Sequence, residues 1–333
     1  MAGSQQTLTS LLRQTHLAHR RALTSSGSPH PHTPVPTPVT YYRGGTSRAL
    51  IFHPTDLPRT PSLRSTLLLQ AIGAPDPYSR QLNGLGAGVS SLSKACLVSR
   101  SQNDPDADVD YTFIGLGIEK PEVDYAGNCG NMSAAIGPYA WEQGLLPSTA
   151  YKEEGQVTVR IRQTNTGTLI HAHFPVARGQ PVVDASTRID GVSGLGTPVR
   201  LDFLQPGGAK TGRLLPTGRA VDELLGLRAS IVDAANPCVF VRAQDIGIRS
   251  TAPPGDIMSQ PGVMARLEAL RTAGAVAMGL VKEGAQVPRV VPKIALIGPR
   301  AEQIVLGGAV VRAGDVDLVR EEGGRRPLWL RHL

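Results

Sequence analysis

The sequence predicts an α+β protein of two domains, built mainly from short strands with few helices. Its 333 residues exceed what one typical core holds, and this length favours two domains. Segments in which apolar and polar residues alternate, such as residues 108–113, are typical of half-buried strands. The chain contains 37 glycines and 27 prolines, which supply the turns that short strands require.

Composition and charge exclude several classes of protein. Three cysteines without spaced pairs argue against a disulfide framework and favour a reducing compartment. No apolar run approaches the roughly 20 residues of a membrane span. The net charge is +7, but Lys and Arg are mixed with acids and no nucleic-acid-binding module is recognisable. We therefore interpret the basic balance as a means of attracting small polyanions.

Residues 1–38 are predicted to be a disordered or targeting extension. No Asp or Glu precedes Asp56, while Arg13, Arg20 and Arg21 lie among Leu, Ser and Thr. This composition resembles a mitochondrial presequence, and a disordered extension without an address is the equal alternative. The predicted localisation is accordingly mitochondrial or cytoplasmic.

The N-terminal domain is predicted to cover residues 39–185. A hairpin closes around residues 165–167, and Gly73 ends an amphipathic helix. His171 and His173 share a strand face, which is more typical of surface residues than of ligands, so we predict no metal site. The predicted strands are 39–42, 49–52, 95–98, 108–113, 157–161 and 169–174, and the predicted helices are 63–72 and 132–143.

A glycine-rich loop (residues 83–94) leads into the strand at 95–98. Loops that cradle nucleotide phosphates open a helix instead, so we reject a phosphate site. Three serine hydroxyls and Lys94 suit this loop to binding carboxylates. A solvated surface loop is the alternative.

Residues 127–131 place a thiol between glycines where a loop turns into the helix 132–143. A helix start carries unpaired N–H groups and a partial positive charge, which favour a carboxylate or a thiolate. Cys129 should therefore lose its proton more easily than a free thiol, whose pKa is about 8.5. The alternative is an inert, buried cysteine. The helix is almost uncharged, as expected if a sheet wraps it, and Gly137-Pro138 is predicted to kink it.

The C-terminal domain is predicted for residues 186–333, after a connection at residues 179–197. Its elements are strands at 199–203 and 293–297, a strand-turn-strand at 231–241 and a helix at 263–280. Cys96 and Cys238 lie inside apolar strands and are predicted to be core residues.

Eight short motifs follow one another in an order that resembles the PrpF family, over roughly residues 39–299. Each is weak alone, but their joint order is specific. They are residues 43–47, 84–86, 90–94, 106–111, 127–132, 215–218, Asn236-Pro237 and 277–280. The resemblance implies a diaminopimelate epimerase-like fold, in which two similar domains each wrap a mixed sheet around a central helix. The active site would lie between the domains.

The resemblance also implies a cofactor-free isomerase that moves an allylic proton in an unsaturated di- or tricarboxylic acid. Family members include isomerases of 2-methylaconitate, aconitate and methylitaconate, and 4-oxalomesaconate tautomerase. This chemistry needs a base, an acid and groups that stabilise a dienolate. We predict Lys94 as the base and Cys129 as its partner, although the sequence leaves the order open. The predicted carboxylate-binding residues are Thr46, Ser47, Ser90, Ser91, Ser93, Asn128, Gly130, Asn131 and Asn236.

The resemblance ends after about Arg320, where the lead-in to a second central helix is followed by unrelated residues. We therefore expect an incomplete second domain, and a catalytically inactive remnant that binds polycarboxylates or a partner protein is the alternative function. Epimerases of this fold use a second cysteine at the start of the second domain's central helix. Cys238 lies in a strand instead, so the resemblance disfavours a racemase. The expected partner is a small di- or tricarboxylate, without nucleic acid or membrane, and a homodimer is left open.

Overall fold

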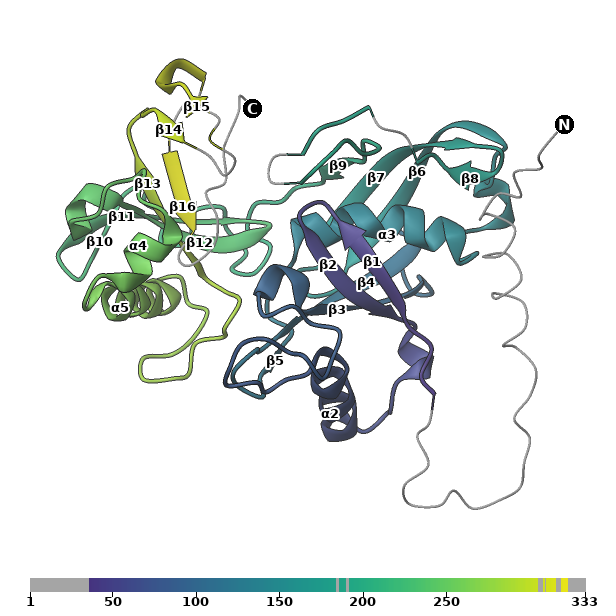
Figure 1. Ribbon diagram of the computed structural model, residues 1–333, viewed down its shortest axis with the longest axis horizontal. Coiled ribbons are helices and arrows are strands. Elements are labelled where there is room, and N and C mark those ends of the chain that lie inside the picture. The colour runs from purple at the N-terminus through teal and green to yellow at the C-terminus, as the bar shows by residue number, and fades with distance from the viewer. Residues whose placement is uncertain are drawn as a thin grey trace, which may run out of the picture. The chain divides into compact units, whose positions relative to one another are not determined.

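The computed structural model describes residues 36–183, 186–189, 192–304, 308 and 310–315, and the backbone of 319–322. A compact unit begins at Pro38. Within the described residues it contains a nine-stranded sheet, a five-stranded sheet and a two-stranded ribbon (Figure 1). The extension predicted for residues 1–38 lies almost wholly outside the described residues. None of the described helices is both long and apolar enough to span a bilayer.

The first sheet is mixed. Its strands are β1 (Thr40–Gly44), β2 (Ser47–Phe52), β3 (Lys94–Arg100), β4 (Val109–Leu116), β5 (Val123–Asp124), β6 (Glu154–Gln163), β7 (Leu169–Ala177), β8 (Gln180–Pro181) and β9 (Arg200–Phe203). The main path runs β1-β2-β3-β4-β6-β7-β8, while β5 pairs with β4 and β9 with β7. The β2–β3 and β4–β6 pairs are parallel and the others are antiparallel. All six strands predicted for the N-terminal domain are present, with shifted ends.

This sheet wraps around helix α3 (Gly130–Glu142), which contacts β1, β2, β3, β6, β7, β8 and β9 (Figure 1). Such enclosure explains the near absence of charge along the helix. Gly137 is required by close packing, because a Cβ there would lie 2.9 Å from a ring carbon of Phe174. Pro138 lies within the continuous helix. We call the α3-facing side of the sheet its inner face.

The outer face of the same sheet carries helix α2 (Pro61–Ile72), which ends at Gly73 in the left-handed conformation with φ 75°. Alternation along β2 divides its side chains between two cores. Ala49 and Ile51 belong to the inner core around α3, whereas Leu50 belongs to the outer core under α2. Because both faces are covered, β2 is apolar on both sides.

The second sheet is also mixed and has its own core. Its strands are β10 (Asp222–Leu224), β11 (Leu227–Ala234), β12 (Asn236–Arg242), β13 (Lys293–Gly298) and β16 (Val319–Glu322), in that spatial order. Helix α5 (Val263–Ala277) contacts β10, β12 and β13, and α4 (Pro254–Ser259) contacts α5. The separate ribbon consists of β14 (Gln303–Ile304) and β15 (Val310–Val311). Ile231, Val239, Leu270 and Leu296 lie in the core between sheet and helices.

One strand assignment is wrong. We predicted the strand at 199–203 as part of the second domain, but β9 pairs with β7 and extends the first sheet beyond residue 185. Alternation of apolar residues predicts a strand without indicating which sheet edge receives it. The expected loss of a second central helix concerns the chain after Arg320, which from residue 323 lies outside the described residues.

Candidate active site

Cys129 is the N-cap residue of α3, as the glycine-bracketed motif predicts. Its backbone is extended, with φ −122° and ψ 100°, and its side chain makes no capping hydrogen bond. The Cys129 carbonyl instead accepts hydrogen bonds from the Ser133 amide at 3.0 Å and the Ser133 hydroxyl at 3.1 Å. Cys129 is half-buried and packs against the inner core, whereas Cys96 and Cys238 are buried.

Lys94 is the first residue of β3 and is almost completely buried, at 6% exposed. Its ammonium donates a hydrogen bond to the Ser90 carbonyl. Lys94 lies two residues before Cys96, which belongs to the inner core, so both side chains lie on the inner face. The predicted base is thus on the side of the sheet that faces α3.

The thiol of Cys96 links the environments of the two predicted catalytic residues. Burial raises the pKa of Cys96 strongly, the neighbouring Cys129 raises it further, and the nearby Lys94 ammonium lowers it. Both groups therefore lie close enough to Cys96 to act on its charge. Cys96 itself is fully buried, as predicted, and stays a neutral thiol.

Tyr111 is a buried neighbour of this group that the sequence analysis missed. Burial raises its pKa, and Cys96 and Cys129 raise it further, while Ser133 lowers it. The signal was present in β4, where Val109, Tyr111 and Phe113 alternate and all join the inner core. Because the pKa of its phenol is raised, Tyr111 stays neutral beside Cys129.

The loop between β1 and β2 lies against the start of α3. The Asn131 side-chain amide donates to Thr46 Oγ1 at 2.8 Å and to Ser47 Oγ at 3.5 Å. A Cβ at Gly44 would overlap the Asn131 carbonyl, so glycine is needed for this approach. The structure therefore brings together two predicted motifs that are distant in sequence.

Asn128 and Asn236 also meet. The Asn236 side chain accepts from the Asn128 amide at 2.9 Å and donates to the Asn128 carbonyl at 3.1 Å. The Asn128 side chain is 6% exposed, and within the described residues neither of its amide atoms has a hydrogen-bond partner. A buried amide in this state is costly unless a ligand group pairs with it. Asn236 thus positions Asn128, and Asn128 offers a donor and an acceptor.

The serines of the glycine-rich loop divide into two groups. Ser90 and Ser91 lie in a short 3-10 turn and are partly exposed. Ser93 is 1% exposed, and its hydroxyl donates to Gln81 Oε1 at 2.6 Å. Ser93 therefore supports the loop from inside, through a glutamine that the sequence analysis did not single out.

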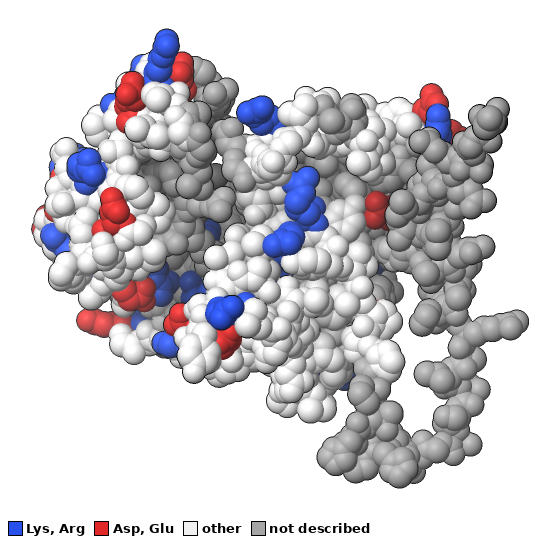
Figure 2. All heavy atoms as spheres, viewed as in Figure 1, with Lys and Arg blue, Asp and Glu red and all other residues white. Residues whose placement is uncertain are grey.

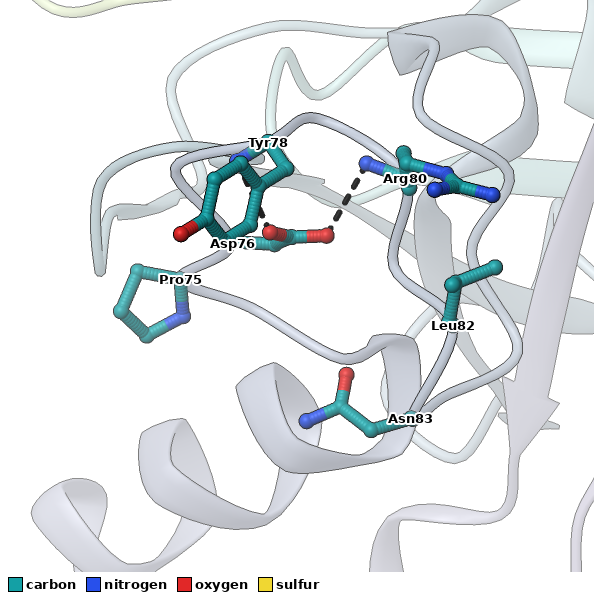
Figure 3. Close-up of a pocket in the computed structure, with 6 residues that line it drawn as sticks. All are labelled: Pro75, Asp76, Tyr78, Arg80, Leu82 and Asn83. Carbon is teal, nitrogen blue, oxygen red and sulfur yellow. Dashed lines mark hydrogen bonds between the residues drawn. The ribbon is translucent and has the colours of Figure 1, made fainter.

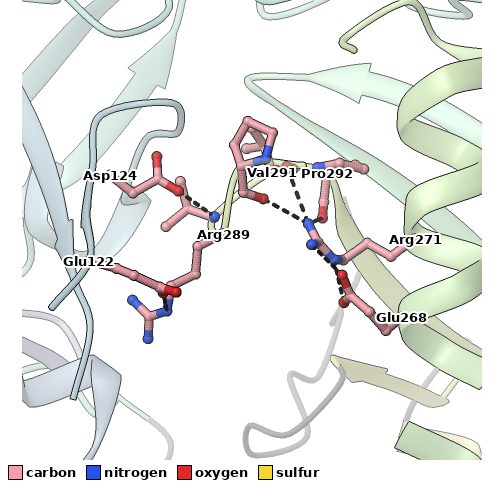
Figure 4. A network of polar contacts seen from close by, with 9 residues as sticks. Glu122, Asp124, Glu268, Arg271, Arg289, Val291 and Pro292 are labelled. Atoms are coloured by element: carbon pink, nitrogen blue, oxygen red, sulfur yellow. Dashed lines mark hydrogen bonds and ion pairs between the residues drawn. The ribbon is translucent and has the colours of Figure 1, made fainter. Parts of the chain in front are cut away.

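A segment at residues 288–292 makes polar contacts with elements of both sheets (Figure 4). The Val290 amide donates to Asp124 at 2.8 Å, and the Arg289 guanidinium donates to the Leu116 carbonyl at 2.9 Å. On the other side, Arg271 of α5 donates to the Pro288 carbonyl at 2.8 Å. Val290 is thereby held against Gly127, the residue that opens the motif around Cys129.

Other surface features do not include the two predicted catalytic residues. A shallow cavity of about 330 Å³ is lined by Pro75, Asp76, Tyr78, Arg80, Leu82 and Asn83 and includes neither Lys94 nor Cys129 (Figure 3). On the face drawn in Figure 2, the described basic side chains form small separate groups rather than a continuous stripe. Among the described residues, no group of three or more His, Cys, Asp or Glu residues is arranged to hold a metal ion.

Comparisons with known proteins show the family and the fold of this chain. The model of the PrpF protein family matches residues 34–323. The 2-methyl-aconitate isomerases of Cupriavidus necator and Shewanella oneidensis are each 38% identical, over 86% and 84% of this chain and 76% and 74% of theirs. The crystal structure of methylitaconate-delta-isomerase is 35% identical, covers 86% of this chain and 75% of that chain, and superimposes with a TM-score of 0.65. The predicted α+β, diaminopimelate epimerase-like fold is confirmed.

Proposed function

Since this chain belongs to the PrpF protein family, we propose that it is a cofactor-independent isomerase that moves an allylic proton within 2-methylaconitate or aconitate. The names of its relatives support the class of substrate. Besides the two 2-methyl-aconitate isomerases, the 3-methylitaconate isomerase of Eubacterium barkeri is 37% identical over 85% of this chain. All three are named for the isomerisation of an unsaturated carboxylic acid.

The observation that carries the proposal is the common environment of Lys94 and Cys129. The Lys94 amine on the inner face of β3 and the Cys129 thiol at the start of α3 both act electrostatically on the buried Cys96 thiol. In its neutral amine form Lys94 removes the allylic proton and becomes the ammonium, while the Cys129 thiol gives a proton to the three-carbon unit and becomes the thiolate. Proton exchange with water restores both groups. Rotation in the delocalised intermediate gives the geometric isomer. Acid and base groups of this kind contribute about 10²–10⁴-fold each.

The negative charges of the dienolate and of the substrate carboxylates must be stabilised by hydrogen-bond donors. The free N–H groups at the start of α3, at Gly130 and Asn131, supply them together with the helix dipole. The side-chain amide of Asn128 is a further donor, and Asn236 holds the backbone of Asn128 in place. The remaining proposed carboxylate ligands are the hydroxyls of Thr46, Ser47, Ser90 and Ser91. The Ser93 hydroxyl instead supports the glycine-rich loop that carries Ser90 and Ser91.

Deuterium incorporation tests this function. Purified protein is incubated in D2O with cis-aconitate or 2-methylaconitate, and carbon-bound deuterium is followed by proton NMR. We expect incorporation by the wild type and a loss of at least about 10²-fold in Lys94→Ala and in Cys129→Ala. Lys152→Ala and Cys238→Ala are matched controls, because Lys152 is exposed and Cys238 is a core residue of the second sheet.

Two results would count against the proposal. If Lys94→Ala and Cys129→Ala both exchanged deuterium at the wild-type rate, Lys94 and Cys129 would not be the acid and base. Binding of these acids without any exchange would favour an inactive polycarboxylate-binding protein. A related tautomerase activity is the second candidate, because the 4-oxalomesaconate tautomerase of Pseudomonas putida is 37% identical over 78% of this chain. A substrate panel decides between the two activities. It also separates 2-methylaconitate from aconitate, which differ by one methyl group worth only about 1–3 kcal/mol of discrimination.

A further inference from the structure

We propose that Gln81 is a positioning residue for Lys94. Its side chain fixes the glycine-rich loop from inside, and that loop carries the carbonyl that holds the Lys94 ammonium. This inference rests on the proposed role of Lys94 in proton transfer. Gln81 itself precedes the loop and belongs to none of the motifs that predicted the site.

The side chain of Gln81 joins two ends of the loop. Its Oε1 accepts hydrogen bonds from Ser93 Oγ at 2.6 Å and from the Gly88 amide at 3.0 Å. Ser93 Oγ in turn accepts from the Ala87 amide at 3.4 Å. A Cβ at Gly86 would overlap the Gln81 amide group, so the loop closes directly around it. Gln81 is only 1% exposed, and a buried network of this kind orders a loop that has little apolar side chain to bury.

Gln81 is itself held by Asp76. The Asp76 carboxylate accepts hydrogen bonds from the backbone amides of Tyr78 and Arg80, each at 2.9 Å (Figure 3). It also accepts a hydrogen bond from the backbone amide of Gln81. These bonds stabilise Gln81 in the left-handed conformation, with φ 52°, which a residue other than glycine seldom adopts. The Gln81 side chain therefore projects from a turn that cannot relax easily.

The glycine-rich loop ends at Lys94, so the position of the Lys94 amine depends on how well the loop is ordered. Lys94 follows Ser93 directly, and its ammonium donates to the Ser90 carbonyl of the same loop. Loss of the Ser93–Gln81 hydrogen bond would loosen the backbone just before Lys94. It would also loosen the Ser90 carbonyl that accepts the hydrogen bond from the Lys94 ammonium. A catalytic group displaced by about 1 Å can cost about 10²-fold in rate. The chain of contacts from Gln81 through Ser93 thus sets the position of the proposed base.

Acylation of Lys94 measures this position directly. The protein is treated briefly with acetic anhydride, and acetylation of Lys94 is determined by peptide mass spectrometry relative to Lys152. Lys152 is exposed, so it serves as an internal reference in the same molecule. The variants are Gln81→Met, which removes the acceptor at similar size, and Gln81→Glu, which keeps an acceptor for Ser93 and Gly88. Gln163→Met is the control, because Gln163 is equally buried but bonds to Asn165 and Thr166.

We expect the Lys94-to-Lys152 acetylation ratio to rise at least fivefold in Gln81→Met, because the nearly buried amine becomes accessible. The ratio should stay within twofold of the wild type in Gln81→Glu and in Gln163→Met. The rate of deuterium exchange at saturating substrate should fall at least tenfold in Gln81→Met, with recovery in Gln81→Glu. Circular dichroism and thermal unfolding establish that each variant is folded.

An unchanged acetylation ratio in folded Gln81→Met would overturn the inference, as would an equal rise in Gln163→Met. Failure of the proposed function gives a different pattern. In that case the wild type shows no deuterium exchange, while the acetylation ratio still depends on Gln81.

Discussion

The side chain of Asn236 pairs with the peptide groups of Asn128, accepting from its amide at 2.9 Å and donating to its carbonyl at 3.1 Å. Asn236 begins β12 of the second sheet, and Asn128 directly precedes Cys129. The preceding residue, Ala235, has a φ of 60°, which makes the tight turn that presents Asn236. A side chain of the second sheet therefore orders the backbone that leads directly into Cys129.

Loss of this pair should weaken both stability and catalysis. Asn236→Ala removes both hydrogen bonds and leaves buried peptide groups unpaired, which costs about 1–3 kcal/mol in the free energy of unfolding. Asn236→Asp should be no better, because its carboxylate faces the Asn128 carbonyl. Urea unfolding and deuterium exchange measure the two effects, with the exposed Asn103→Ala as the control. If both variants matched Asn103→Ala, the pair would have no role in ordering Cys129.

Gly127 should not tolerate a side chain, whereas Gly130 should. A Cβ at Gly127 would lie 2.9 Å from Val290 Cγ2, but at Gly130 the nearest atom is Phe203 Cζ at 3.9 Å. Gly127→Ala is therefore expected to cost about 1–3 kcal/mol of unfolding free energy through overpacking. Adding Val290→Ala should recover part of this cost, which a double-mutant cycle by urea unfolding measures. Simple additivity would show that Val290 does not limit the space at Gly127.

The three thiols should differ in reactivity. Cys129 is half-buried, whereas Cys96 is 0% exposed and Cys238 is 6% exposed. We expect one rapidly reacting thiol in a titration with a disulfide reagent, and none in Cys129→Ala. Because burial raises the pKa of Cys96, it should stay unlabelled even at a pH of about 9, above the usual cysteine value. Rapid labelling of Cys96 in the native protein would contradict the packing around α3.

The turn from Asp76 to Gln81, which the Asp76 carboxylate holds, should become less stable in acid. The backbone amides of Tyr78 and Gln81 lower the pKa of Asp76 below its ordinary value. A lowered pKa means that the charged form stabilises the fold at neutral pH, and that this contribution disappears as the pH falls through the folded-state pKa. The destabilisation caused by Asp76→Asn should therefore be full at pH 7 and shrink towards zero below the folded-state pKa. Urea unfolding across this range measures it, with the exposed Glu154→Gln as the control, and a difference independent of pH would contradict the assignment.

Short-range patterns predicted much of the fold. Alternation predicted the strand at residues 108–113, because a strand that buries one face must repeat every two residues. Short apolar runs next to turn residues predicted strands such as 49–52 and 95–98. Gly73 predicted the end of α2, and the glycine-bracketed Cys129 predicted the start of α3, because caps depend on local backbone geometry. The same local logic placed Lys94 at the end of a loop rich in hydroxyls.

What the sequence alone determined, then, is the list of chemical groups and the elements that carry them. Tertiary structure alone decided that β9 joins the first sheet, that Gln81 consumes the Ser93 hydroxyl, and that Asn236 reaches Asn128. These choices depend on pairing and burial between segments far apart along the chain. No periodicity or motif within one segment encodes which distant partner satisfies a buried polar group, because that partner is selected by packing.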